Sequence, residues 1–152
     1  MIKNWYLLVL FSMFILFFIA CSPQPEPINY ETDICAYCKM SISDTQFGAE
    51  LVTKKGKVYK FDSIECLINF MSEEKDVASQ KKFLLTVDYS SPTKLINVEE
   101  SFYVQTDSIS SPMGANILSF EQKSEAEKIV SKYNGKLMRW NEVVNYVLSL
   151  ND

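Results

Sequence analysis

Residues 56–64 read Gly-Lys-Val-Tyr-Lys-Phe-Asp-Ser-Ile, and residues 135–143 read Gly-Lys-Leu-Met-Arg-Trp-Asn-Glu-Val. The two stretches align without a gap. Each predicts a Gly-Lys turn, a short strand that ends in an aromatic residue, an Asx cap at Asp62 or Asn141, and then a helix. This match indicates that the chain contains two small units built on one plan.

The sequence around each stretch extends this plan. Residues 49–53 predict a strand that a Lys-Lys-Gly turn joins to the first stretch as a hairpin. Residues 116–120 predict the corresponding strand of the second unit. Between that strand and Gly135, a capping box Ser124-x-x-Glu127 predicts a further helix that ends at Asn134-Gly135. Residues 83–89 and 102–105 also read as strands.

Apolar residues recur at helical spacing after both Asx positions. We expect the core to receive Ile64, Leu67, Ile68 and Met71 from the first helix, Val143, Val147 and Leu150 from the second, and Ala126, Ile129, Val130 and Tyr133 from the helix between. The sequence therefore predicts an α+β fold of two related β-hairpin/helix units. The folded domain is expected to cover residues 35–152, divided into about 35–78 and 79–152.

Composition limits the function. The 152 residues are 47% hydrophobic and 22% charged, which suits a globular fold. The net charge of −4 and pI near 4.9 give no basic face for nucleic acid, so we expect no nucleic-acid partner. Four cysteines, six methionines and no histidine exclude a Ser-His-Asp triad and any histidine-based zinc or haem site. Sulfur and carboxylate remain as ligands for a transition metal.

The first twenty residues read as an export signal with one charge, Lys3, and an apolar run too short to span a membrane. Ala20-Cys21 at its end resembles a bacterial lipobox, which implies cleavage before Cys21 and acylation of its sulfur. Residues 21–34 then include three alternating prolines and predict an extended tether. We expect a lipid-anchored protein outside the cytoplasm, facing the periplasm, with Ser22 favouring the outer membrane.

Three sulfurs lie within six residues in Cys35-Ala-Tyr-Cys38-Lys-Met40. The Cys-x-x-Cys pair has three interpretations: a redox dithiol, a structural disulfide, or a metal site. Met40 lies two residues after Cys38 and so on the same face of an extended segment. A thiolate beside a thioether favours Cu(I) over zinc, because soft ligands select soft ions.

Two further sulfurs are candidates for this site. Cys66 lies off the apolar face of its helix and aligns with the polar Asn145, so we expect it to face solvent or a site, or to form a disulfide with Cys35 or Cys38. Met113 lies between Pro112 and Gly114 in a loop, where a methionine is presented to the surface or fills a gap in the packing.

The residues that carry sulfur and those of the predicted strands together resemble the NosL family of lipoprotein copper chaperones. The resemblance covers nearly the whole chain after the leader and rests on Cys35-x-Tyr-Cys38-x-Met40-x-Ile42, Gly56-Lys-Val-Tyr-Lys-Phe61-Asp62, Phe102-Tyr103-Val104, Ser111-Pro112-Met113-Gly114, Phe120 and Ala126-Glu127.

The resemblance implies a carrier of Cu(I), not an enzyme, that delivers copper to nitrous oxide reductase or to its copper-delivery membrane complex during maturation for denitrification. It also implies a fold similar to that of the organomercurial lyase MerB. Cys38, Met40 and Met113 match the most widely shared sulfur positions of the family, and Cys35 and Cys66 match a narrower pattern. Because the chain has no histidine, Asp62 or a further sulfur would complete the site.

Two other functions remain open from the sequence. One is an extracytoplasmic thiol-disulfide oxidoreductase that uses Cys35 and Cys38. The other is a lipid-tethered binding module whose cysteines only stabilise the fold.

Overall fold

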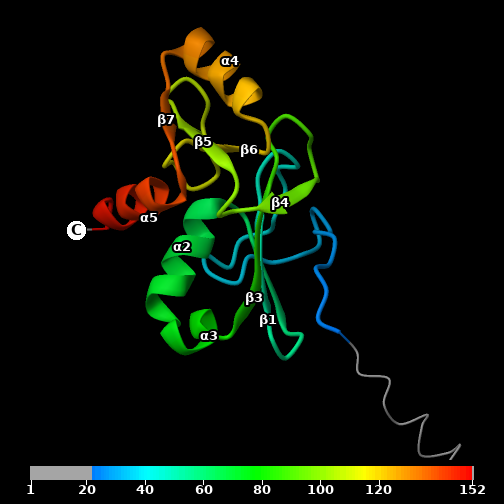
Figure 1. Cartoon of the computed structure of the whole chain (residues 1–152). Coiled ribbons are helices and arrows are strands. Elements are labelled where there is room, and N and C mark those ends of the chain that lie inside the picture. Colours follow the sequence, from blue (N-terminus) through cyan, green and yellow to red (C-terminus); the bar gives the residue numbers. More distant parts are fainter. Residues whose placement is uncertain (1–21, 152) are drawn as a thin grey trace, which may run out of the picture.

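The computed structural model of the protein describes residues 22–151 and contains two small antiparallel sheets with four helices (Figure 1). In chain order the elements are β1 (Ala49–Thr53), β2 (Val58–Phe61), α2 (Ile64–Glu73), α3 (Lys75–Ser79), β3 (Lys81–Val87), β4 (Leu95–Asn97), β5 (Phe102–Gln105), β6 (Ile117–Phe120), α4 (Lys123–Tyr133), β7 (Lys136–Met138) and α5 (Trp140–Ser149). The predicted signal peptide and the predicted lipidation site, Cys21, lie outside the described residues.

The first sheet has the strand order β2-β1-β3-β4. The predicted strand 49–53 and its hairpin to β2 are confirmed, with Glu50 opposite Lys60 across the pair. Gly56 forms the turn with a φ of 85°, a left-handed conformation that glycine adopts without strain. Helix α2 packs on one face of β1 and β2.

The start of α2 differs from the prediction. Ser63, not Asp62, is the N-cap residue, and its Oγ accepts a hydrogen bond from the Cys66 amide at 3.5 Å. The Asp62 amide is instead directed to the thiol of Cys35. The helix buries Ile64, Leu67 and Ile68 as expected, while Met71 is half-buried.

The second sheet has the order β6-β5-β7, so the predicted strands around residues 102–105 and 116–120 form its hairpin. Helix α4 packs on this sheet and ends, as predicted, at Asn134, which has a φ of 51°. Its predicted capping box is wrong. The helix begins at Lys123 after Gln122, and the Glu127 carboxylate binds Lys123 Nζ at 2.9 Å, so it does not reach back to a cap.

Helix α5 packs against α2 and β5 and thereby joins the two sheets. It starts at Trp140, with Arg139 rather than the expected Asn141 as its cap. Val143 and Val147 are buried as predicted, but Leu150 is 54% exposed because it is the C-cap residue, beyond the last turn of the helix. A hydrogen-bonded pair of hydroxyls, Thr86 and Ser119 at 3.1 Å, also links β3 to β6.

The observed class is the α+β fold that was predicted, with small sheets and helices. The first sheet continues through β3 and β4 to Asn97, so the division between the sheets falls after that residue and not near residue 78. The similarity to MerB stays a prediction.

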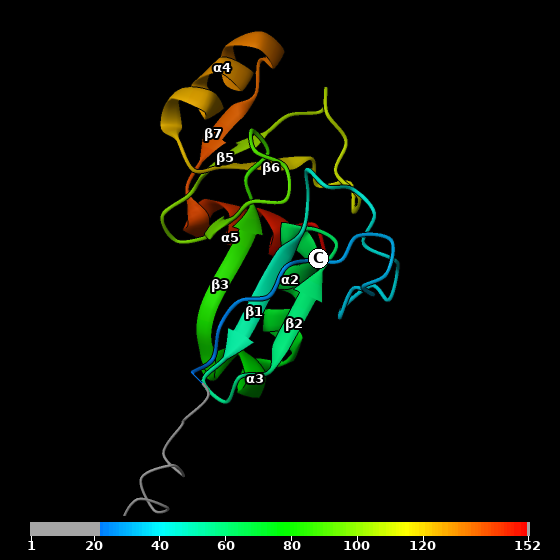
Figure 2. The ribbon, with the colours of Figure 1, turned by 90° about the vertical axis from the view of Figure 1, so that its right-hand side faces the viewer.

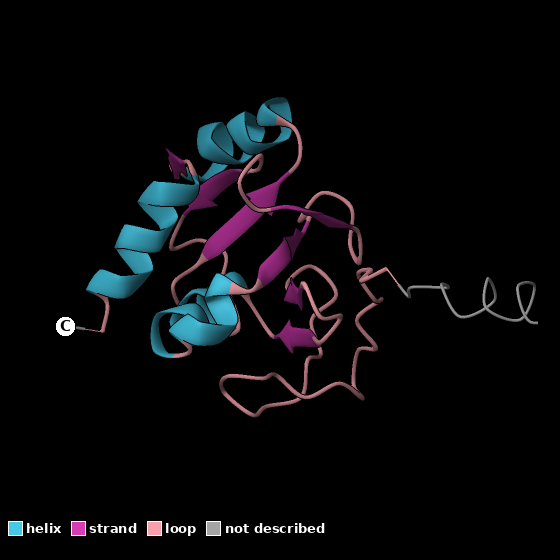
Figure 3. Cartoon of the chain, turned by 60° about the horizontal axis from the view of Figure 1, so that its bottom comes forward, coloured by secondary structure: helices cyan, strands magenta, loops and turns pink. Residues whose placement is uncertain are grey.

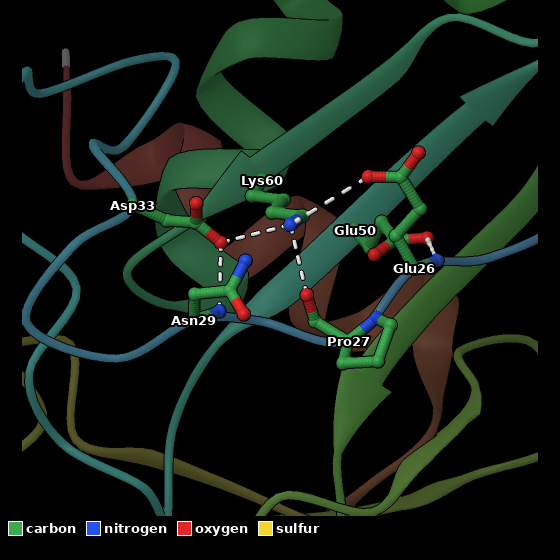
Figure 4. A network of polar contacts seen from close by, with 6 residues as sticks. All are labelled: Glu26, Pro27, Asn29, Asp33, Glu50 and Lys60. Carbon is green, nitrogen blue, oxygen red and sulfur yellow. Dashed lines mark hydrogen bonds and ion pairs between the residues drawn. The ribbon is translucent and has the colours of Figure 1, made fainter.

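The segment 22–33 covers the face of the first sheet that α2 leaves open, so all of β1 is buried (Figure 2). The segment has no helix or strand, as its prolines predict, but it is fixed to the sheet. Lys60 Nζ binds Asp33 Oδ2 at 2.8 Å, the Pro27 carbonyl at 2.8 Å and Glu26 Oε2 at 3.8 Å (Figure 4). Seen from below, the helices lie toward one side of the strands and the long loops toward the other (Figure 3).

Glu50 is a fully buried carboxyl under this segment. Its Oε1 accepts a hydrogen bond from the Glu26 amide at 3.1 Å, while its Oε2 has no partner. Burial is the main cause that raises the pKa of Glu50 to about 7. Since this pKa is above that of an unfolded chain, the folded protein loses stability as the pH rises through about 7.

We therefore expect Glu50→Gln to raise the free energy of unfolding by about 1–3 kcal/mol near pH 8 and to change it little near pH 4. Urea unfolding at both pH values measures the difference. Glu100→Gln, at an exposed turn position, is the matched control. Equal effects of Glu50→Gln at the two pH values would contradict the assignment.

Candidate metal centre

Three cysteine thiols meet at one point of the structure. The Sγ atoms of Cys35, Cys38 and Cys66 all lie within 4.8 Å of one another, and all three thiols are free. Cys35 and Cys66 are fully buried, whereas Cys38 is half-buried. The cluster therefore has a closed interior and one thiol that solvent reaches.

A tight loop brings Cys35 and Cys38 together. The Cys35 amide donates to the Met40 carbonyl at 2.8 Å, and the Lys39 amide donates to the Cys35 carbonyl at 3.2 Å. Lys39 adopts a φ of 65°, which lets the chain reverse within these residues. The Ala36 amide donates to the Lys60 carbonyl at 2.8 Å and so attaches the loop to β2.

Cys66 reaches the same point from a different element. It is the third residue of α2, after the Ser63 cap, and the first turn of the helix faces the loop. A helix N-terminus carries partial positive charge and unpaired amides, which stabilise a thiolate nearby. Cys66 thus lies buried beside Cys35 and Cys38 and not toward solvent, and its role as a metal ligand stays a prediction.

The cluster is arranged to hold negative charge on Cys35. The Cys66 thiol donates to it, and the amides of Asp62, Tyr37 and Cys38 add further hydrogen bonds, which together lower the pKa of Cys35 despite its burial. Cys66 donates this hydrogen bond, so its own pKa is raised. Burial is also the main cause that raises the pKa of Cys38.

The spacing suits a single metal ion. Metal–thiolate bonds such as Zn–S are about 2.3 Å long, so two sulfurs on one ion are at most about 4.6 Å apart. Sulfurs within 4.8 Å of one another need to move only slightly to meet that limit. Three thiols without histidine favour a soft ion over a hard one.

The other predicted ligands lie around this cluster in different ways. Met40 contributes its backbone: its amide donates to the Cys38 thiol, and its side chain is 54% exposed. The Asp62 amide donates a hydrogen bond to Cys35. The Asp62 carboxyl is buried, and its pKa rises to about 6, first because of burial and then because of the charge of Cys35. The roles of Met40 and Asp62 as metal ligands stay predictions.

Met113 is presented by a turn, as expected from its neighbours. The Gly114 amide donates to the Ser111 carbonyl at 3.1 Å, and the Met113 side chain is 39% exposed. This turn is attached to α2, because the hydroxyl of Ser111 donates to the buried carboxylate of Glu65, the residue before Cys66. The structure thus brings the Met113 turn to the helix end that bears Cys66, and the role of Met113 as a ligand stays a prediction.

The contact between Ser111 and Glu65 was not predicted from the sequence, although Ser111 belongs to the Ser-Pro-Met-Gly motif. Ser111 also accepts from the Asn116 amide at 2.9 Å, so it fixes both ends of the loop. The only signal was the Pro-Met-Gly turn itself, because a buried acid in a helix looks like any surface acid in sequence.

The fold and the cluster together define a small α+β protein with a candidate metal centre of three thiols. The family model described as NosL matches residues 27–148, so the chain belongs to the NosL family. It is 26% identical over 125 residues to the copper-binding lipoprotein NosL of Stutzerimonas stutzeri, covering 78% of this chain and 66% of that relative. The chain thus spans slightly less than two thirds of that relative's length.

A solved structure extends the comparison to three dimensions. The crystal structure of the copper chaperone NosL from Shewanella denitrificans matches with a TM-score of 0.66 and 31% identity, over 79% of this chain and 95% of that one. The relatives carry the names of copper-binding proteins and not of enzymes. None of the helices in the described part of the chain has the length and apolarity that a membrane crossing needs.

Proposed function

We propose that this protein is a lipid-anchored Cu(I) carrier that holds the ion at Cys35, Cys38 and Cys66 and delivers it for assembly of the copper centres of nitrous oxide reductase. The observation that supports this most is the meeting of three free thiols at one point. Family membership supplies copper as the cargo.

The arrangement suits transfer of an ion more than permanent storage. Two thiols are buried and fix the ion, while Cys38 is half-buried and lies at the surface of the cluster. A partner thiolate or thioether therefore approaches from the Cys38 side and displaces one ligand at a time. Structural metal sites, in contrast, are closed on all sides.

Met40 and Met113 complete this route in our proposal. Their exposed thioethers are soft ligands outside the thiol cluster. Met40 follows Cys38 by two residues, and the turn that bears Met113 is bound to α2 through Ser111 and Glu65. The proposed setting is extracytoplasmic, with acylated Cys21 as the anchor and the enzyme, or the membrane complex that supplies its copper, as the partner.

The thiol-disulfide alternative is disfavoured by the exposure of the cysteines. A thiol that exchanges disulfides needs a lowered pKa and access to its substrate in the same residue. Here the pKa is lowered at Cys35, which is fully buried, and raised at Cys38, which is accessible.

An anaerobic Cu(I) titration against a chromophoric chelator tests the proposal. We expect the wild-type chain to bind Cu(I) tightly, and Met40→Leu with Met113→Leu to weaken binding by about ten-fold. Met71→Leu, a half-buried methionine further along α2, is the control and should bind as the wild type does. If the double variant binds Cu(I) unchanged, the thioethers play no part and the thiols alone hold the ion.

A further inference from the structure

Five exposed lysines gather at one end of the first sheet. Lys54, Lys55 and Lys57 form the turn between β1 and β2, and Lys81 and Lys82 begin β3. Strand pairing holds them together, because Thr53 pairs with Lys81 and the Lys54 amide donates to the Gln80 carbonyl at 2.8 Å. We refer to these five residues as the lysine end.

The lysine end is positive on a chain whose net charge is −4. Of its members, Lys81 is in an ion pair, with Glu99 at 3.4 Å, and within residues 22–151 the other four form none. Lys57 and Lys82 lie over the rings of Tyr59 and Phe83 at 4.5 and 5.3 Å. The acidic residues that precede Lys81, Glu74 and Asp76, belong to α3 and its cap on the helix side of the sheet (Figure 1). Glu50 and Asp62, near the hairpin in sequence, are both buried.

The described chain also begins at this end. Lys82 Nζ donates to Ser22 Oγ and to the Pro23 carbonyl, both at 3.3 Å. Figures 1 and 2 both show the start of the segment beside the turn between β1 and β2, with α4 at the opposite end of the molecule. Ser22, the residue after Cys21, is therefore held against Lys82 of the lysine end.

We propose that the lysine end is a membrane-facing surface that binds anionic phospholipid headgroups. Its proximity to the bilayer rests on the proposed lipid anchor at Cys21, but its charge and position are properties of the fold. Lysines near an anionic bilayer each strengthen binding by about five-fold, so several exposed lysines orient a protein that one lipid chain only tethers.

This orientation fixes where the copper cargo is presented. The thiol cluster adjoins the Phe61 end of β2, and the lysine turn is at the other end of that strand. A strand rises about 3.3 Å per residue, so the cluster stands about 15 Å from the membrane-facing end. The fold thus directs the cluster away from the headgroups and toward a partner in the aqueous compartment.

Lysine footprinting on the full chain, expressed with its own leader and recovered from membranes, tests this surface. The protein is reconstituted in vesicles of phosphatidylcholine alone or of phosphatidylcholine with phosphatidylglycerol, and acetylation of each lysine is followed by mass spectrometry. We expect Lys54, Lys55 and Lys57 to react about five-fold more slowly with phosphatidylglycerol present. Lys123, Lys128 and Lys132 of α4 should react equally in both.

The same spectra separate failure of the anchor from failure of the surface, because they show whether Cys21 is acylated. If it is not, sedimentation of the chain with phosphatidylglycerol vesicles replaces the footprint. The surface is then supported if K54Q/K55Q/K57Q abolishes binding that K123Q/K128Q/K132Q retains. The proposal would be overturned if Lys54, Lys55 and Lys57 react as fast as the α4 lysines in both kinds of vesicle, or if the two triple variants bind vesicles equally. Protection of these lysines seen only with an acidic protein partner would also overturn it.

Discussion

Replacing Cys66 by serine is expected to lower the Cu(I) affinity by on the order of 100-fold, more than the loss of both exposed methionine sulfurs. The reason is position: Cys66 Sγ lies in the buried part of the thiol cluster, where a hard hydroxyl cannot replace a soft thiolate. Two thiols, one of them half-exposed, would remain to hold the ion. Anaerobic competition with a Cu(I) chelator measures the change.

The variant should retain its fold, because serine is close to cysteine in size and the Ser63 cap is untouched. Thermal unfolding of the metal-free protein checks this. Ser72→Ala, on the same helix and outside the cluster, is the matched control and should bind Cu(I) as the wild type does. An affinity of Cys66→Ser within a few-fold of the wild type would show that the ion is held elsewhere, with Met40 and Met113 as the next candidates.

The repeat predicted much of the fold because its signals are local. Strand 49–53, the turn at Gly56 and the helix end at Asn134 each depend on residues that are neighbours in sequence, and each is confirmed. Strand β4 and the short helix α3 were missed. Strand β4 is held in place by pairing with β3, as when Thr86 pairs with Ile96, whereas α3 is a single short turn that packs on the neighbouring α2.

The predicted helix starts failed for a related reason. Asp62 and Ser124 have the right side chains for caps, but other contacts compete: the Asp62 amide is directed to Cys35 in a distant loop, and Glu127 pairs with Lys123 one turn earlier on the same helix. A capping motif shows which side chains can accept a hydrogen bond from the first amides of a helix, but neighbouring groups determine which of these hydrogen bonds form.

The candidate site shows the same difference between contacts of sequence neighbours, which were predicted, and contacts of distant residues, which were not. Cys-x-x-Cys predicted that Cys35 and Cys38 meet, and the helical position of Cys66 predicted that it leaves the apolar face; the structure brings all three together. The anchor between Ser111 and Glu65 was invisible, because 46 residues separate its two side chains. Met40 and Met113 stay predicted ligands, because packing does not fix the position of an exposed side chain.

The second large effect is on stability. Lys60→Met is expected to lower the free energy of unfolding by about 2–4 kcal/mol, because it leaves the partly buried carboxylate of Asp33 without its cation. The Lys60 side chain is only 13% exposed and binds Asp33 at 2.8 Å, with Glu26 at 3.8 Å. The fully buried Glu50, directly opposite on β1, would lose the nearby positive charge as well.

Lys60→Met should also release the segment 22–33, because Lys60 Nζ donates a hydrogen bond to the Pro27 carbonyl and so fixes this segment to the sheet. Urea unfolding measures the stability, and limited proteolysis measures whether cleavage within residues 22–33 becomes faster. Lys128→Met, in an exposed pair with Glu125 on α4, is the control and should lower the free energy of unfolding by less than about 0.5 kcal/mol.

Because Asp33 stands two residues before Cys35, release of the segment 22–33 should also loosen the loop that carries the Cys35 thiol. Lys60→Met with unchanged stability and unchanged cleavage would mean that the segment is held by its apolar contacts alone, through residues such as Ile28 packed against the core.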